Sequence, residues 1–199
     1  MCFTKPSERK YFLAFLIGIL AGVFSAIVKW GWEVPFPPRA NNPVWPEGAT
    51  DRAVPPNIFL EQIGLGDWVH VEQAGQVVNQ GLTYVFSGFT MPLCTFIIHV
   101  GFSVVFAVLY CVIAEAWPRI KMWQGAVFGV GVYLFAHVIV MPLIAETPPL
   151  SQIPFDENLS EFFGHIVWLW AIEIVRRDIR NRITKQPDPE LNTSCCSKK

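Results

Sequence analysis

Four apolar segments, each long enough to cross a bilayer, constrain the fold of this chain more than any other feature of its sequence. A transmembrane helix needs about 20 mostly apolar residues. Windows of that kind cover residues 11–30, 95–117, 123–145 and 159–177. We therefore predict an all-α integral membrane protein, with four transmembrane helices packed as a bundle in a single membrane domain over residues 1–199.

Charge is scarce in this chain. Charged residues make up 16% of the sequence, whereas soluble domains carry about 25%. The formal net charge is −1, which argues against nucleic acid as a partner. The lipid bilayer is the expected partner.

The distribution of lysine and arginine predicts the orientation, because these residues gather on the cytoplasmic side of inner-membrane proteins. The loops at 34–94 and 146–158 are poor in them. The N-terminal tail, the turn between the second and third segments, and the C-terminal tail are rich in them. We therefore expect both termini to be cytoplasmic. The residues concerned are Lys5, Arg9, Lys10, Arg119, Lys121, Arg176, Arg177, Arg180, Arg182 and Lys185.

The long outer loop, residues 34–94, has two parts. Seven prolines between 35 and 56 disfavour helix. The stretch "NIFLEQIGLGDW" mixes apolar and acidic residues and predicts a short interfacial helix. The stretch "GLTYVFSGFTMPLC" is apolar but too short to span, so we expect an interfacial or re-entrant segment. Residues 178–199 are expected to form a cytoplasmic tail.

Small residues recur at helical spacing in two of the segments. Gly18 and Gly22 lie one turn apart in the first, as do Gly125 and Gly129 in the third. Small residues allow helix backbones to approach closely in lipid. These pairs predict close helix contacts within the bundle.

Ionisable residues in the membrane are the candidate functional residues, because burying them is costly. With the predicted orientation, they fall in the outer half of the bilayer in all four segments. We expect a proton-responsive polar cluster, supported by Arg39, Tyr133 and Glu161. In the cluster, Lys29 and Glu33 are expected to pair. A purely structural role, with hydrogen-bonded packing histidines and with Lys29 and Glu33 snorkelling at the membrane interface, is the alternative. The members of the predicted cluster are Lys29, Glu33, His99, His137 and His165.

Three acidic residues have simpler local explanations. Asn158 and Glu161 are spaced as a capping box at the start of the fourth helix. The other two acids are expected in ion pairs at the membrane surface. These pairs are Glu173 with Arg176 or Arg177, and Glu115 with Arg119 or Lys121.

Several long blocks resemble the YagU family of bacterial inner-membrane proteins. They include "SAIVKWGWEVPFPPR", "SVVFAVLYCVIAEAWPRIKMWQG" and "ENLSEFFGHIVWLWAIEIVRRDIRNRIT" with "PDPE" after it. The resemblance covers nearly the whole chain and is weakest at about residues 40–80. It implies a small multi-spanning inner-membrane protein with a link to acid resistance, and it assigns no catalytic residue.

Four functions remain open at this point. Histidines that charge as the outside acidifies would make the protein pH-responsive. A haem- or metal-binding protein would use the same histidines as ligands, although the sequence leads us to expect no cofactor and no metal. A small transporter subunit would need a homo-oligomer to form a pore, and an adaptor would act through its outer loops. No catalytic motif argues for an enzyme.

Overall fold

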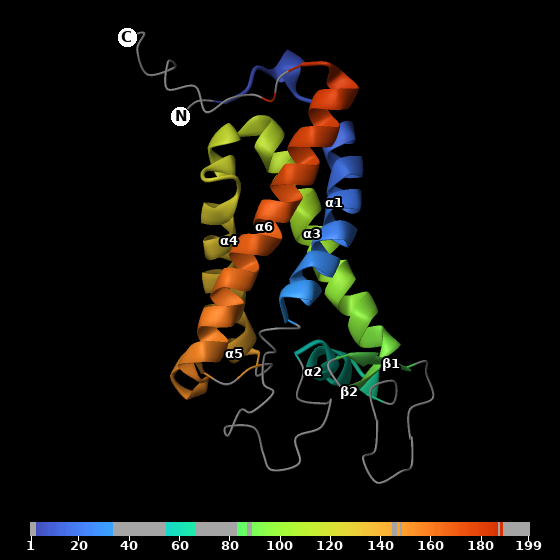
Figure 1. Ribbon diagram of the computed structural model, residues 1–199, viewed down its shortest axis with the longest axis vertical. Coiled ribbons are helices and arrows are strands. Elements are labelled where there is room, and N and C mark those ends of the chain that lie inside the picture. Colours follow the sequence, from blue (N-terminus) through green and yellow to red (C-terminus); the bar gives the residue numbers. More distant parts are fainter. Residues whose placement is uncertain are drawn as a thin grey trace. The chain divides into compact units, whose positions relative to one another are not determined.

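The fold is described from a computed structural model, which describes residues 3–33, 55–66, 83–86, 89–144, 147, 149–186 and 188 (Figure 1). The contacts divide the chain into two compact units. The first unit comprises residues 1–31, 102–132 and 162–199, and the second comprises residues 32–101 and 133–161. The elements, in chain order, are η1 (Pro6–Glu8), α1 (Tyr11–Glu33), α2 (Pro55–Gln62), β1 (Thr83–Phe86), β2 (Phe89–Pro92), α3 (Leu93–Ala116), η4 (Pro118–Lys121), α4 (Ala126–Val132), η5 (Tyr133–Val140), α5 (Met141–Leu143), η6 (Leu150–Gln152) and α6 (Phe155–Thr184).

Three helices among the described residues are long and apolar enough to cross a membrane. They are α1, α3 and the continuous helix Ala126–Leu143 that joins α4, η5 and α5. The predicted fourth segment also forms a helix, α6, which has 30 residues and is longer than expected. The helix α6 is not among these three, because its charged side chains make it less apolar than they are. The predicted all-α membrane fold is confirmed.

Close backbone contact between α1 and α3 organises the first unit. A methyl group added at Gly18 would lie 2.6 Å from the Cα of Val108, and one at Gly22 would lie 2.5 Å from the Cα of Val104. As the residue number rises along α1 it falls along α3, so the two helices are antiparallel. The prediction that this glycine pair allows close approach is confirmed.

Close backbone approach at a glycine also joins α4 to α6. A methyl group at Gly129 would lie 2.7 Å from the carbonyl oxygen of His165. Gly125 has a φ of +87°, a left-handed conformation in which glycine is favoured, and it lies against the carbonyl oxygen of Leu169. These contacts confirm the second predicted glycine pair.

The second unit contains the largest departures from the predictions. The segment 83–92 forms a two-stranded antiparallel hairpin, β1 and β2, in which Thr83 pairs with Pro92 and Phe86 with Phe89. The sequence predicted an interfacial or re-entrant segment here and did not predict strands, although aromatic and β-branched residues favour them. The predicted short helix exists as α2, but it begins at Pro55, ahead of the quoted stretch.

The helix from α4 to α5 is widened into a π-helix over eight residues, Tyr133–Val140. This π-helix stands directly before Pro142, which has no N–H to donate and whose ring crowds the preceding turn. Widened turns of this kind are frequent at functional sites. His137 lies within the widened segment.

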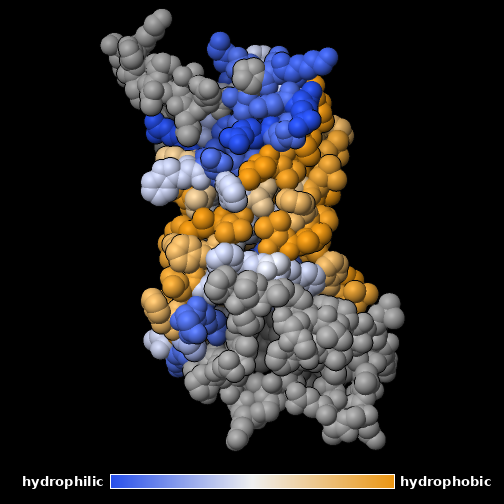
Figure 2. Space-filling view, in the orientation of Figure 1, coloured by the Kyte–Doolittle hydropathy of each residue, from blue (hydrophilic) through white to orange (hydrophobic). Residues whose placement is uncertain are grey.

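The outward surface of the described helices is apolar. On α1, the side chains of Phe12, Leu20 and Ile27 are exposed by 76%, 59% and 56%. Figure 2 shows this apolar surface, with most hydrophilic residues gathered at one end of it and a smaller hydrophilic group near the other. Exposed apolar helix faces suit a lipid surrounding.

Candidate functional site

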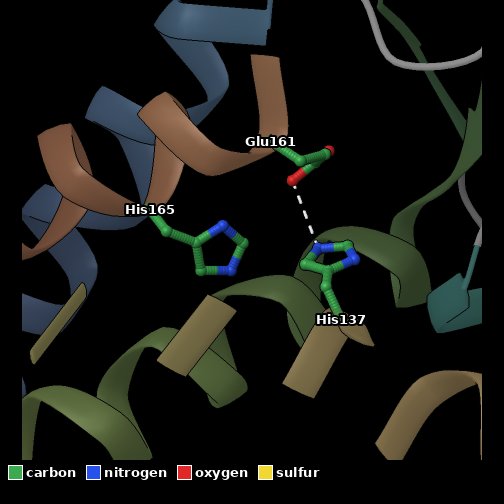
Figure 3. Close-up of side chains that lie close together, drawn as sticks. All are labelled: His137, Glu161 and His165. Atoms are coloured by element: carbon green, nitrogen blue, oxygen red, sulfur yellow. Dashed lines mark ion pairs between the residues drawn. The ribbon is translucent and has the colours of Figure 1, made fainter. Parts of the chain in front are cut away.

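The candidate site is built around an ion pair between His137 and Glu161. The imidazole Nε2 of His137 lies 3.2 Å from Oε2 of Glu161 (Figure 3). The side chains are 13% and 10% exposed, respectively. The widened helix η5 presents the histidine, and the second turn of α6 presents the carboxylate. The contact carries a full charge pair only when the imidazole is protonated.

Two further side chains surround this pair. Tyr133, one turn before His137 on η5, is buried and has its ring centroid 5.9 Å from that of the imidazole. His165 follows Glu161 by one turn on the continuous helix α6, so the two share a helix face. His165 is buried, and its ring meets that of Trp168 edge-on at 5.9 Å. Glu157, one turn before Glu161, is also buried.

His137, Glu161 and His165 each offer one ligand atom, and these atoms all lie within 4.8 Å of one another (Figure 3). We call these three residues the His–Glu–His cluster. Each imidazole can carry one proton or two, and the carboxylate can accept hydrogen bonds from both imidazoles. The same donor types are those that Zn²⁺ and other first-row cations take in proteins.

The capping role predicted for Asn158 and Glu161 was wrong. The helix α6 begins at Phe155, so both residues lie inside it. The side-chain amide of Asn158 donates instead to the carbonyl oxygen of Ile153, at 3.1 Å. Glu161 is thereby left to face the histidine of η5.

The other predicted site residues are only partly placed. Lys29 and Glu33 lie in the last turns of α1, which ends at Glu33, and both are half-buried. His99 is half-buried in the second turn of α3. That these three meet the histidines of the cluster stays a prediction. Arg39 lies outside the described residues.

A second group of buried charges occupies the first unit, at the end where α3 stops and α1 starts. We call it the ion network. Arg180 Nε lies 2.5 Å from Oε1 of Glu115, and both side chains are 2% exposed. The backbone N–H of Lys10 donates to the other oxygen of Glu115, at 3.0 Å. Glu115 was predicted near Arg119 or Lys121, so its actual partner corrects that prediction.

The network continues along α6. Arg176 donates to both carboxylate oxygens of Glu173, at 2.6 Å and 2.8 Å, which confirms the predicted pair. The hydroxyl of Tyr110 donates to the same carboxylate at 3.0 Å. Arg176 also donates to Asp188 at 2.9 Å and 2.6 Å, and Lys121 pairs with Asp188 as well.

Burial and neighbouring charges both shift the pKa values of two ions in this network, Asp188 and Lys121. Burial alone would raise the pKa of Asp188, but the hydrogen bonds and charge of Arg176, with those of Lys121, hold it below its ordinary value. Burial, reinforced by the charge of Arg176, lowers the pKa of Lys121 despite the neighbouring Asp188. Each ion of the network therefore depends on its partners remaining charged.

Comparison with known proteins identifies the family. Residues 23–174 match the family described as "Protein of unknown function (DUF1440)". The chain belongs to this family. It is 46% identical over 203 residues to the inner membrane protein YagU of Escherichia coli (strain K12), and the alignment covers 94% of each chain. No solved structure matches the chain.

Membership of the DUF1440 family, together with the apolar helices, establishes a multi-pass inner-membrane protein. The predicted resemblance to YagU is confirmed. The matched region includes all three residues of the His–Glu–His cluster, whereas Arg180 and Asp188 lie beyond it.

The sequence reasoning missed most of the ion network. Arg176 was expected in an ion pair at the membrane surface and Arg180 in the cytoplasmic tail, yet the two residues are only 1% and 2% exposed. Asp188 was predicted only to lie in that tail. The one available signal was "PDPE", a polar block that the family resemblance retained beyond the helix.

Proposed function

We propose that this inner-membrane protein responds to pH through the His–Glu–His cluster, and that it contributes in this way to acid resistance. The observation that carries the proposal is the 3.2 Å contact between His137 and Glu161. Histidine is the side chain whose ordinary titration falls between pH 5 and 8. A contact of this kind changes its charge over the range that an acidified exterior would impose.

The number of protons bound to the cluster sets its net charge, and therefore whether protonation stabilises or destabilises the packed helices. A first proton, on His137 or His165, converts the cluster into a pair of opposite charges with Glu161. A second proton gives these three residues a net positive charge. Excess buried charge is costly, so we expect the second proton to loosen the helices that hold the cluster.

Two neighbouring side chains, Glu157 and Tyr133, affect the charge balance of the cluster. Glu157 is a second buried carboxylate on α6, and the hydroxyl of Tyr133 stands on η5 beside His137. A carboxylate one turn away from the cluster moderates the cost of the second proton without removing it. The tyrosine is neutral throughout the acidic range and contributes packing and a hydrogen-bonding group.

Survival after an acid challenge tests the proposal in cells. The double variant His137→Asn, His165→Asn should lose protection in an Escherichia coli strain that lacks its own YagU, while growth at neutral pH stays normal. His70→Asn is the matched control, because it removes an imidazole that lies outside the apolar segments of the sequence. Equal survival of wild type and double variant, at equal protein levels, would reject the proposal.

Elemental analysis of the purified protein separates the proposal from the metal-binding alternative. The pH-responsive protein is expected to carry no stoichiometric transition metal. One metal ion per chain, lost in the double variant and kept in His70→Asn, would contradict the proposal. It would assign the three donors to a cation instead.

A further inference from the structure

The tail residue Asp188 occupies a basic cradle that is built by other elements. Its carboxylate accepts two hydrogen bonds from Arg176, at 2.9 Å and 2.6 Å. It also pairs with Lys121, and Oδ1 lies 3.8 Å from Nε of Arg180. One carboxylate therefore meets three cations, which come from η4 and α6.

Asp188 differs from the rest of the ion network in how it is held. The helix α6 ends at Thr184, so Asp188 lies beyond the last element, whereas the three cations lie on helical elements. Its side chain is 12% exposed, compared with 6% for Lys121, 1% for Arg176 and 2% for Arg180. Among these residues, the anion is the member nearest to solvent.

The charges of the network balance only when Asp188 is present. Three cations face three carboxylates, namely those of Glu115, Glu173 and Asp188. Without Asp188 the buried network would carry one excess positive charge. Nη1 of Arg180 is also buried and makes no hydrogen bond among the described residues. Without Asp188, the excess charge and the unused donor of Arg180 would favour the binding of another anion.

The geometry of the cradle suits a phosphate group. Guanidinium groups bind phosphate and carboxylate through the same planar pair of N–H donors, and lysine adds a point charge. The cradle stands beyond Ala116, the last residue of the apolar helix α3, because Lys121 lies in the following turn. We propose that Lys121, Arg176 and Arg180 form a phosphate-binding site, in which the carboxylate of Asp188 is the resident occupant.

Removing the charge of Asp188 tests this site. In detergent, the Tm of Asp188→Asn should rise with added inorganic phosphate or phosphatidylglycerol, relative to chloride or to diacylglycerol, which lacks phosphate. Asp178→Asn is the matched control, since it breaks an exposed ion pair with Arg182 on the same helix. Adding Lys121→Gln to Asp188→Asn should cancel the rise. No rise with either phosphate source would overturn the proposal.

The two sources of phosphate give distinguishable results. A rise with phosphatidylglycerol alone assigns the site to a lipid headgroup, and a rise with both shows that free phosphate suffices. If Asp188→Asn does not fold, tryptic cleavage after Lys185 in the wild type decides. Phosphate that displaces Asp188 should release the tail and accelerate this cleavage. An unchanged cleavage rate with both sources would then overturn the proposal.

Discussion

Replacing Gly22 by alanine should separate α1 from α3. The added methyl group would lie 2.5 Å from the Cα of Val104 and 2.9 Å from its backbone nitrogen. Non-bonded carbon atoms rest about 3.5–4.0 Å apart, so the two backbones must move apart by about 1 Å. Backbone atoms cannot move aside as the end of a flexible side chain can.

The same movement would strain a buried hydrogen-bond network. The hydroxyl of Ser103 donates to the carbonyl oxygen of Gly22 at 2.7 Å, and Trp168 donates to that hydroxyl at 2.8 Å. Over-packing of a close-packed interior costs about 1–3 kcal/mol. For a chain of this size, that corresponds to a Tm lower by roughly 2–12 °C.

Thermal unfolding in detergent, followed by circular dichroism, measures this loss. Gly31→Ala is the matched control, because it makes the same change on the same helix at a place where none of the described residues lies within 4 Å of the added methyl. The account expects Gly22→Ala to melt well below the wild type and Gly31→Ala to melt at or above it. Equal melting of the two variants would refute the reasoning from backbone approach.

Two further predictions concern the ion network. Glu115→Gln leaves Arg180 buried with its main partner neutral, which should cost about 3–5 kcal/mol; an unchanged Tm would contradict this. The pKa of Asp188 is held below its ordinary value of 3.8. Its contribution to stability is therefore complete above that value and is lost as pH falls through the lower folded-state pKa. Asp188→Asn should lower the neutral-pH Tm and flatten its decline in strong acid, whereas Asp178→Asn should do neither; identical Tm-against-pH curves for both would count against the assignment.

The helical part of the fold could be predicted because it depends on local patterns. Apolar length gave the helices, and the glycine pairs in the first and third segments predicted which faces approach closely. Sequence patterns pointed to all three residues of the His–Glu–His cluster, with His137 and His165 as expected members and Glu161 as an expected supporting residue. The preferred role of Glu161 was helix capping, however, since the true start of α6 at Phe155 left no clear signal.

The ion network could not be predicted in the same way. The partners Glu115 and Arg180 are 65 residues apart, and Lys121 and Asp188 are 67 apart. Periodicity within one helix cannot select among several arginines for such pairs. The hairpin formed by β1 and β2 was hidden for another reason, because a short apolar run fits a strand or an interfacial segment equally well.

The pH dependence of unfolding in Glu161→Gln tests the central claim most directly. In the wild type, the first proton on the cluster balances the charge of Glu161, and only the second gives the three residues a net positive charge. In Glu161→Gln, the first proton already lacks a carboxylate in the cluster. The account predicts that the variant loses stability at a higher pH than the wild type as the solution is acidified. Coincident Tm-against-pH curves for the two proteins would contradict a pH response through this cluster.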